Sequence, residues 1–133
     1  MQSYLGQLKG TILVVDDDLK ALEEMAEALQ DFGLTVYTAV NEAVALELAL
    51  KHRPDFVIMD YLLQGYTGLE AIKEIHKVLP ETKVIMISAF DDLSRVVTST
   101  NSSVIAVLKK PLSIETIGRF LSNQLDQKNH RPR

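Results

Sequence analysis

The sequence predicts an α/β fold of (βα)5 order, a doubly wound five-stranded parallel sheet. Short apolar runs rich in β-branched residues alternate along the chain with segments of helical periodicity. Four of the five runs are continuously apolar, which is typical of parallel strands with helices on both faces. Five such alternations favour right-handed crossovers and a single sheet between two helical layers.

Each expected strand is four or five residues long, and the strands are expected at 12–15, 34–37, 56–59, 84–87 and 104–108. The helices repeat apolar residues at spacings of three and four, and they are expected at about 19–29, 41–50, 69–78, 92–99 and from 113 onward. Asp18, Asn41 and Ser113 are placed to cap the first, second and fifth helices. Gly33 can end the first helix in a left-handed conformation. The fourth helix is the weakest, because several of its residues are β-branched.

Length and composition indicate one globular domain. The chain has 133 residues, 47% of them hydrophobic and 24% charged. It has no cysteine, which excludes a thiol nucleophile and a thiolate metal site. A net charge of −4 provides no basic surface for direct nucleic-acid binding. No apolar run is long enough for a membrane span or a signal peptide, so we expect a cytoplasmic protein that does not contact membranes.

We divide the chain into three parts. Residues 1–10 are expected to be an N-terminal extension, 11–127 the folded domain and 128–133 a flexible basic tail. The tail contains Lys128, Arg131 and Arg133, and a solvated chain end explains this charge better than a binding arm does.

Charged and hydroxyl side chains follow the strands at the points where the strands end. The first strand runs into three aspartates at 16–18, the third into Asp60, the fourth into Ser88 and the fifth into Lys110. Ligands of open parallel sheets bind outside the carboxyl ends of the strands. We therefore expect these side chains to share one site.

The chemistry of this set points to phosphorus. Neighbouring carboxylates repel one another unless a cation intervenes, and hard oxygen ligands suit Mg²⁺. A carboxylate can also attack phosphorus and form an aspartyl phosphate. The oxygens of the transferred group then need neutralising, which a metal ion, a lysine and a hydroxyl can do together. The complete set for such a transfer is Asp16, Asp17, Asp60, Ser88 and Lys110.

From about Thr11 to about Gln127 the chain resembles the receiver domain of bacterial response regulators, the chemotaxis-receiver-like module of two-component signalling. Four signatures occur in the family's order: ILVVDDD at 12–18, DFVIMD at 55–60 continuing through Gly65 to GLE at 68–70, VIMISA at 84–89, and KKP at 109–111. The resemblance implies a flavodoxin-like sheet with strand order 2-1-3-4-5.

The same resemblance implies a role for each residue of the site. Asp60 would be the phosphoacceptor, and Ser88 and Lys110 would contact the phosphoryl group. The implied ligands of Mg²⁺, for which Mn²⁺ can substitute, are Asp16, Asp17, Asp60 and the backbone carbonyl of Leu62. The peptide bond between Lys110 and Pro111 is often cis in this family, and cis costs little at an X–Pro bond.

Three positions depart from the family's pattern. Gln64 stands where the family usually has proline and Thr67 where it often has aspartate, which should alter the loop after the third strand. Val107 replaces the usual Tyr or Phe three residues before the lysine, so the chain lacks the ring that normally swings inward. We therefore expect output to rely on movement of Ser88, Ala89 and the loop after them.

Leu62 and Phe90 lie two residues beyond Asp60 and Ser88. In the family these two positions border the path of the hydrolytic water. Here both side chains are large and apolar, and neither can orient a water molecule. We therefore expect the phosphorylated domain to dephosphorylate itself slowly.

The resemblance implies a regulatory switch and not an enzyme, with at most self-phosphorylation from small donors and slow self-dephosphorylation. A histidine kinase or a histidine-phosphotransfer protein would supply the phosphoryl group. The domain would then change its affinity for a downstream protein through helix 4, strand 5 and helix 5, a face that would also suit a homodimer. The residues specify neither the kinase nor the target.

Two alternatives remain open. The first is a pseudo-receiver that is never phosphorylated, which the valine at position 107 would fit. The second is a Mg²⁺-dependent phosphohydrolase that forms an aspartyl phosphate, because Asp16 and Asp18 match the Asp-x-Asp spacing of haloacid-dehalogenase-like phosphatases. We identify no cap domain or substrate pocket for the second alternative, and Asp18 is better explained as a helix cap.

Overall fold

The computed structural model describes residues 6–63, 66–89 and 104–129 and confirms the expected α/β fold. Five parallel strands form one sheet in the order β2-β1-β3-β6-β7. These strands are β1 (Thr11–Val15), β2 (Thr35–Ala39), β3 (Phe56–Asp60), β6 (Lys83–Ser88) and β7 (Val104–Lys109). Because β6 and β7 are the fourth and fifth strands of this sheet along the chain, the order is the predicted 2-1-3-4-5.

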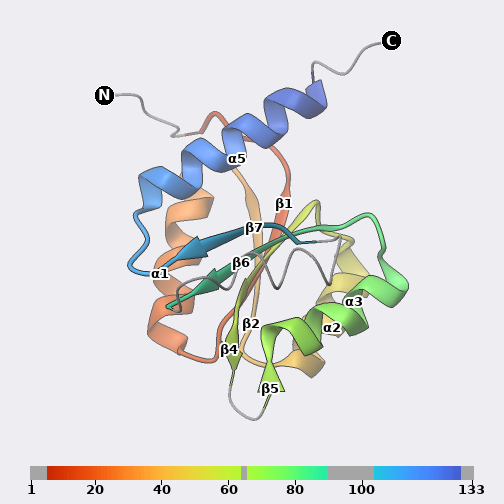
Figure 1. Ribbon diagram of the computed structural model, residues 1–133. Helices are drawn as coiled ribbons and strands as arrows, with labels where there is room; N and C mark the ends of the chain where they lie inside the picture. Colours follow the sequence, from red (N-terminus) through yellow and green to blue (C-terminus); the bar gives the residue numbers. More distant parts are fainter. Residues whose placement is uncertain (1–5, 64–65, 90–103, 130–133) are drawn as a thin grey trace.

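The described residues contain four helices, which cover the two faces of the sheet. Helices α1 (Leu19–Asp31) and α5 (Ile114–Asn129) lie on one face, and α2 (Glu42–His52) and α3 (Gly68–Val78) lie on the other (Figure 1). None of these four helices is both long and apolar enough to cross a membrane. The helix expected at 92–99 lies outside the described residues.

The sheet separates two apolar clusters, because successive side chains of a strand point to opposite faces. In β1, Leu13 and Val15 belong to the cluster under α2 and α3, whereas Ile12 and Val14 belong to the cluster under α1 and α5. Every residue of β3 is buried. The central strands are thus enclosed on both faces, which is why their sequences are continuously apolar.

Side-chain caps begin the helices where the sequence predicts them. The Asp18 carboxylate accepts hydrogen bonds from the backbone N–H groups of residues 20 and 21, and Asn41 and Ser113 accept equivalent bonds at the starts of α2 and α5. Thr67 caps α3 in the same way, since its hydroxyl accepts the Glu70 N–H at 3.3 Å. Threonine in place of the family's aspartate therefore still supplies a cap.

The folded unit begins before Thr11, where we expected it to start. The N–H of Gly6 donates to the carbonyl of Asp31, and that of Leu8 donates to the carbonyl of Phe32, both at 2.8 Å. These bonds satisfy carbonyls that the end of α1 leaves without helical partners. The Leu8 side chain is buried in the cluster under α1 and α5. At the other end, α5 continues beyond the expected boundary at 127.

A short antiparallel hairpin follows β3, and the sequence did not predict it. It pairs β4 (Leu62–Leu63) with β5 (Tyr66–Thr67). The hairpin leads directly into α3 and thus links the end of β3 to the start of that helix. Gln64 lies between the two strands, outside the described residues.

Candidate functional site

The carboxyl ends of four strands bring the expected side chains to one edge of the sheet. Asp16 follows β1, Asp60 ends β3, Ser88 ends β6 and Lys110 follows β7. The lysine is positioned by its backbone, because its N–H donates to the Ser88 carbonyl at 2.8 Å and continues the pairing of β6 with β7. The peptide bond between Lys110 and Pro111 is cis.

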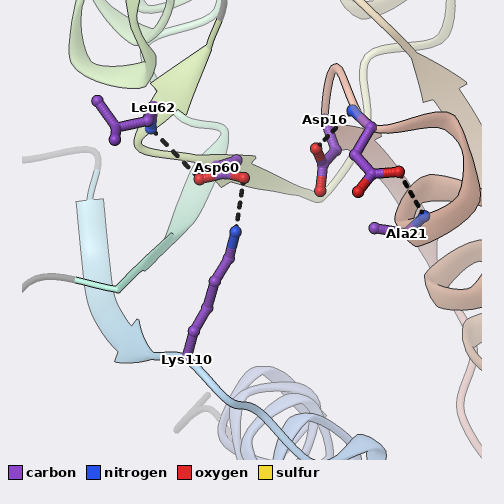
Figure 2. A network of polar contacts seen from close by, with 6 residues as sticks. Asp16, Ala21, Asp60, Leu62 and Lys110 are labelled. Atoms are coloured by element: carbon purple, nitrogen blue, oxygen red, sulfur yellow. Dashed lines mark hydrogen bonds and ion pairs between the residues drawn. The ribbon is translucent and has the colours of Figure 1, made fainter.

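An ion pair lies at the centre of this edge. The Nζ of Lys110 donates to Oδ2 of Asp60 at 2.8 Å (Figure 2). The Asp60 side chain is only 12% exposed, whereas that of Lys110 is 42% exposed. Burial alone would lower the pKa of the lysine, but the hydrogen bond and the charge of Asp60 outweigh burial and raise the pKa above its ordinary value of 10.5. The lysine is therefore firmly protonated beside a largely buried carboxylate.

The backbone after Asp60 holds the carboxylate in place. Its Oδ1 accepts the Leu62 N–H at 3.3 Å, and the Leu62 side chain, which is 53% exposed, points away from the carboxylate (Figure 2). The Tyr61 N–H donates to the Ile87 carbonyl at 2.8 Å, which extends the pairing between β3 and β6 by one step. One oxygen of Asp60 thus faces a cation and the other a backbone amide.

Gly68, the first residue of α3, lies directly against the end of β3. Its N–H donates to the carbonyl of Tyr61 at 2.5 Å. A Cβ at this position would collide with the carbonyl oxygen of Asp60 and would lie 2.8 Å from Cγ of Met59. Glycine is therefore required by close approach of the two backbones. The sequence contains this glycine in a family signature, but its contact with Asp60 emerges only from the structure.

Asp16 adds negative charge next to Asp60. Its N–H donates to the Ala39 carbonyl at 3.1 Å, and its Oδ1 accepts the N–H of Asp18 at 2.9 Å. Burial raises the pKa of Asp16 most, and the charges of Asp60 and Asp17 also raise it. The hydrogen bond from Asp18 and the charge of Lys110 lower it, but the net shift is upward. The charges of Asp60 and Asp17 thus add to burial in disfavouring the charged form of Asp16.

A cation would relieve this repulsion, although the carboxylates do not form a ready-made cage. Among the described residues, no three acidic or histidine side chains are grouped closely enough to hold a metal ion. Mg²⁺ does not require such a cage, because it commonly keeps several waters and takes only one or two carboxylates. The oxygen donors and the excess negative charge around Asp16 fit that mode of binding.

The residues expected to act in switching are placed only in part. Ser88 is buried at 1% exposure, and Ala89 after it is exposed. Val107 is half-buried opposite Met86 and packs against the cluster under α2 and α3. Phe90 lies outside the described residues.

Comparisons with known proteins identify the family and the fold of the chain. The family model of the response regulator receiver domain matches residues 12–121. The chain is 31% identical over 127 residues to the DNA-binding transcriptional regulator NtrC of Escherichia coli K12, and 27% identical over 119 residues to the sporulation initiation phosphotransferase F of Bacillus subtilis 168. Among solved structures, a CheY-like response regulator receiver domain protein from Methanospirillum hungatei superposes with a TM-score of 0.82 at 25% identity, covering 94% of this chain and all of that one.

The similarity covers different shares of these relatives. It spans 92% of this chain but only 27% of NtrC. It spans 90% of this chain and 96% of the Bacillus phosphotransferase. Chemotaxis protein CheY4 of Vibrio cholerae is covered to 98%, with a TM-score of 0.79 and 26% identity. The shared unit is therefore the domain itself, which occurs both within longer regulators and as most of a short chain.

Proposed function

The chain belongs to the response regulator receiver domain family, and from this premise we propose that it is a phosphorylation-controlled switch whose phosphoacceptor is Asp60. The observation that carries the proposal is the contact of Lys110 Nζ with Asp60 Oδ2 at 2.8 Å. It places a protonated lysine beside a largely buried carboxylate, at the edge of the sheet where such folds bind ligands. Hydrogen bonds from Leu62 and Lys110 orient the two oxygens of the Asp60 carboxylate, which is the proposed nucleophile.

We propose the following transfer from a phosphohistidine. A carboxylate oxygen of Asp60 attacks phosphorus, the P–N bond breaks, and its electron pair returns to the imidazole, which takes up a proton. The Lys110 ammonium then contacts a phosphoryl oxygen in place of its present carboxylate partner. The Ser88 hydroxyl, at the end of the neighbouring strand, hydrogen-bonds another phosphoryl oxygen. The Asp60 acyl phosphate keeps the transferred group on the domain.

The negative charge of the phosphoryl group and of the nearby carboxylates favours binding of a divalent cation. Asp16, Asp17, Asp60 and the Leu62 carbonyl would hold Mg²⁺, or Mn²⁺ in its place. When bound, this ion neutralises non-bridging oxygens of the phosphoryl group. Burial is the main cause of the raised pKa of Asp16, and the charges of Asp60 and Asp17 add to it, so a bound cation would offset a carboxylate charge that this edge of the sheet disfavours. The carboxylate of Asp18 is engaged with backbone N–H groups as the cap of α1, which argues against the Asp-x-Asp phosphohydrolase.

The donor in the cytoplasm would be a histidine kinase or a histidine-phosphotransfer protein. The Bacillus relative is named a phosphotransferase and is covered almost to its full length, which supports a role in passing phosphoryl groups between proteins. Phosphorylation would change the affinity of the domain for a downstream protein. The size of this change is limited by the difference in interaction free energy that the phosphoryl group has with the inactive and active conformations. Strand β7 and helix α5 would form part of the output face, and a homodimer would use the same face.

Switching in this chain would proceed without an aromatic ring at position 107. Val107 is packed against the core and has no ring to move inward. We therefore propose that the output movement involves Ser88, Ala89 and the loop after them, which lies outside the described residues. Structures with and without a phosphoryl mimic on Asp60 test this assignment, and an unmoved Ser88 together with an unmoved loop would contradict it.

Reductive trapping tests the phosphoacceptor directly. Borohydride converts an aspartyl phosphate to homoserine, so the chain is incubated with acetyl phosphate and Mg²⁺, reduced, digested and sequenced by mass spectrometry. We expect homoserine at position 60 and nowhere else. Homoserine at position 16 would favour the phosphohydrolase alternative. If no aspartate is converted to homoserine, the pseudo-receiver is favoured.

A further inference from the structure

The end of the sheet opposite Asp60 carries a hollow of about 850 Å³. It lies where α2 connects to β3 and α3 connects to β6, and these two connections run side by side at the end of the sheet away from the arrowheads of β6 and β7 (Figure 1). Phe56 and Lys83, the first residues of β3 and β6, line it, whereas Asp60 and Ser88 are the last residues of those strands. At about 3.3 Å per residue, the hollow is roughly 13 Å from the phosphoacceptor.

The walls of the hollow are tied together. The Thr82 hydroxyl donates to the carbonyl of Pro54 at 3.2 Å, and the Lys83 N–H donates to the carbonyl of Asp55 at 3.3 Å. These bonds join the two connections across the hollow. Pro54, Phe56 and Thr82 are buried beneath it. The volume of the hollow lies within the range of small-molecule sites.

Its lining combines apolar surface with cations whose side chains have no partner among the described residues. The apolar part includes the buried Phe56 and Leu79 and the 44% exposed Val78. Arg53 and Lys83 line the same hollow, and neither forms an ion pair or side-chain hydrogen bond with another described residue.

Two carboxylates also line the hollow, but they are not equivalent. Oδ2 of Asp55 accepts the N–H of Thr11 at 2.9 Å, so this carboxylate is turned toward the start of β1. Glu81 is exposed at the hollow and has no hydrogen bond or ion pair with another described residue. Among the charged lining residues, Arg53, Lys83 and Glu81 are therefore the ones without a side-chain partner in the described part of the chain, and Gln124 adds an uncharged amide to the lining.

Arg53 is the one described non-glycine residue with a positive φ, at φ 45° and ψ 63°. It ends α2 in the left-handed conformation, a position that glycine or asparagine occupies with less strain. The backbone alone therefore does not explain an arginine here. The side chain lines the hollow, which supplies a reason for keeping it.

We propose that this hollow binds a small carboxylate with an apolar body, such as an aromatic or short aliphatic acid. The carboxylate would pair with Arg53 and Lys83, and the apolar body would cover Phe56, Leu79 and Val78. A guanidinium pairs well with a carboxylate because it presents two parallel donors. The competing explanation is that the two cations only compensate the negative ends of α2 and α3, which would give them a role in stability and none in binding.

The test is an NMR titration of the full chain with benzoate, using neutral benzamide as the matched control. We expect benzoate to shift the amide signals of Thr82 and Lys83 at the hollow, and benzamide to shift them much less. Arg53→Gln and Lys83→Gln should each weaken benzoate binding about tenfold, the loss of one charge-assisted pair. Glu81→Gln should tighten it, because a repulsive charge is removed.

Two further variants separate binding from stability. Arg53→Gly removes the side chain and relieves the left-handed strain, so it should fold at least as well as the wild type and still lose the binding. Lys51→Gln removes a cation from the last turn of α2 that does not line the hollow, so affinity should be unchanged. The proposal is overturned if benzoate leaves the hollow unshifted, if benzamide binds equally well, or if Lys51→Gln weakens binding as much as Arg53→Gln.

Discussion

Replacing Gly68 with alanine tests whether close backbone packing positions the phosphoacceptor. The new methyl group would collide with the Asp60 carbonyl oxygen and lie 2.8 Å from Cγ of Met59. Both atoms belong to buried β3, which is paired with β1 on one side and β6 on the other. Met59 Cγ is a side-chain atom and can shift, but the Asp60 carbonyl oxygen is part of the backbone and cannot withdraw without moving the strand. We therefore expect α3 and the end of β3 to separate by a fraction of an ångström.

The magnitude follows from two opposing effects. Overpacking of this kind costs roughly 1–3 kcal/mol of unfolding free energy. Alanine returns up to about 1 kcal/mol relative to glycine in a helix interior, and less at the first position of a helix. The net loss in Gly68→Ala should therefore be about 1–2 kcal/mol. Because displacement of a reacting group by about 1 Å can cost on the order of 100-fold in rate, phosphorylation of Asp60 should slow by about tenfold or more.

Urea unfolding measures the first effect, and the initial rate of phosphorylation by acetyl phosphate, followed by intact mass, measures the second. Lys73→Ala provides a control on the exposed side of α3, and it should change neither quantity appreciably. A Gly68→Ala variant with wild-type stability and wild-type rate would refute the reasoning. A slower rate at unchanged stability would refute only the estimate of the packing cost.

Three more predictions concern the same site. Lys110→Met removes the cation that pairs with the largely buried Asp60. Because the lysine is partly exposed, we expect the free energy of unfolding to fall by only about 1 kcal/mol. A loss no larger than that of the control Lys73→Met would contradict this prediction. The pKa of Asp16 in the folded protein is raised above 3.8, so the native state binds the proton of this carboxyl more tightly than the unfolded state does. The contribution of Asp16 to the free energy of unfolding therefore falls as pH rises through the raised pKa. In urea unfolding without Mg²⁺, Asp16→Asn should therefore gain stability relative to the wild type as pH rises through that range, and parallel curves would show the sign to be wrong. Leu62→Asn should shorten the lifetime of the phosphoryl group by offering a side chain that can orient water, whereas a wild-type half-life of seconds would disprove slow self-dephosphorylation.

The regular part of the fold was predictable because burial leaves a strong pattern. Four of the five strands of the main sheet appeared as continuous apolar runs and the second as a weaker one, and the observed strands differ from the expected ones only at their ends. The caps at Asp18, Asn41 and Ser113 were predictable because a short polar side chain just before a helical apolar pattern can accept a hydrogen bond from the free N–H groups of the first turn. Strand order came from the family resemblance, since periodicity does not specify it.

The candidate site was predictable in its members and less so in its contacts. The parallel topology alone requires that residues following β1, β3, β6 and β7 lie at one edge. The direct pairing of Lys110 with Asp60 did not follow from the sequence, because it depends on where a long flexible side chain comes to rest. The approach of Gly68 to Asp60 is likewise a contact between two backbones, which leaves only a glycine as its signal.

Three features had too little sequence signal to be predicted. The hairpin of β4 and β5 has two residues in each strand, too few for a periodic pattern. Leu8 lies in a segment that has no helical or strand periodicity, so its burial in the core could not be inferred. Arg53 adopts a left-handed conformation that arginine does not favour.

The most direct test of the central claim is the intact mass of the chain after incubation with acetyl phosphate and Mg²⁺, beside an Asp60→Ala variant and a sample containing EDTA. We predict a single phosphoryl adduct that is absent from both controls. An adduct that persists in Asp60→Ala would place the phosphoacceptor elsewhere, and one that persists with EDTA would remove Mg²⁺ from the mechanism. The absence of an adduct under every condition would contradict phosphorylation and leave the domain as an unswitched interaction module.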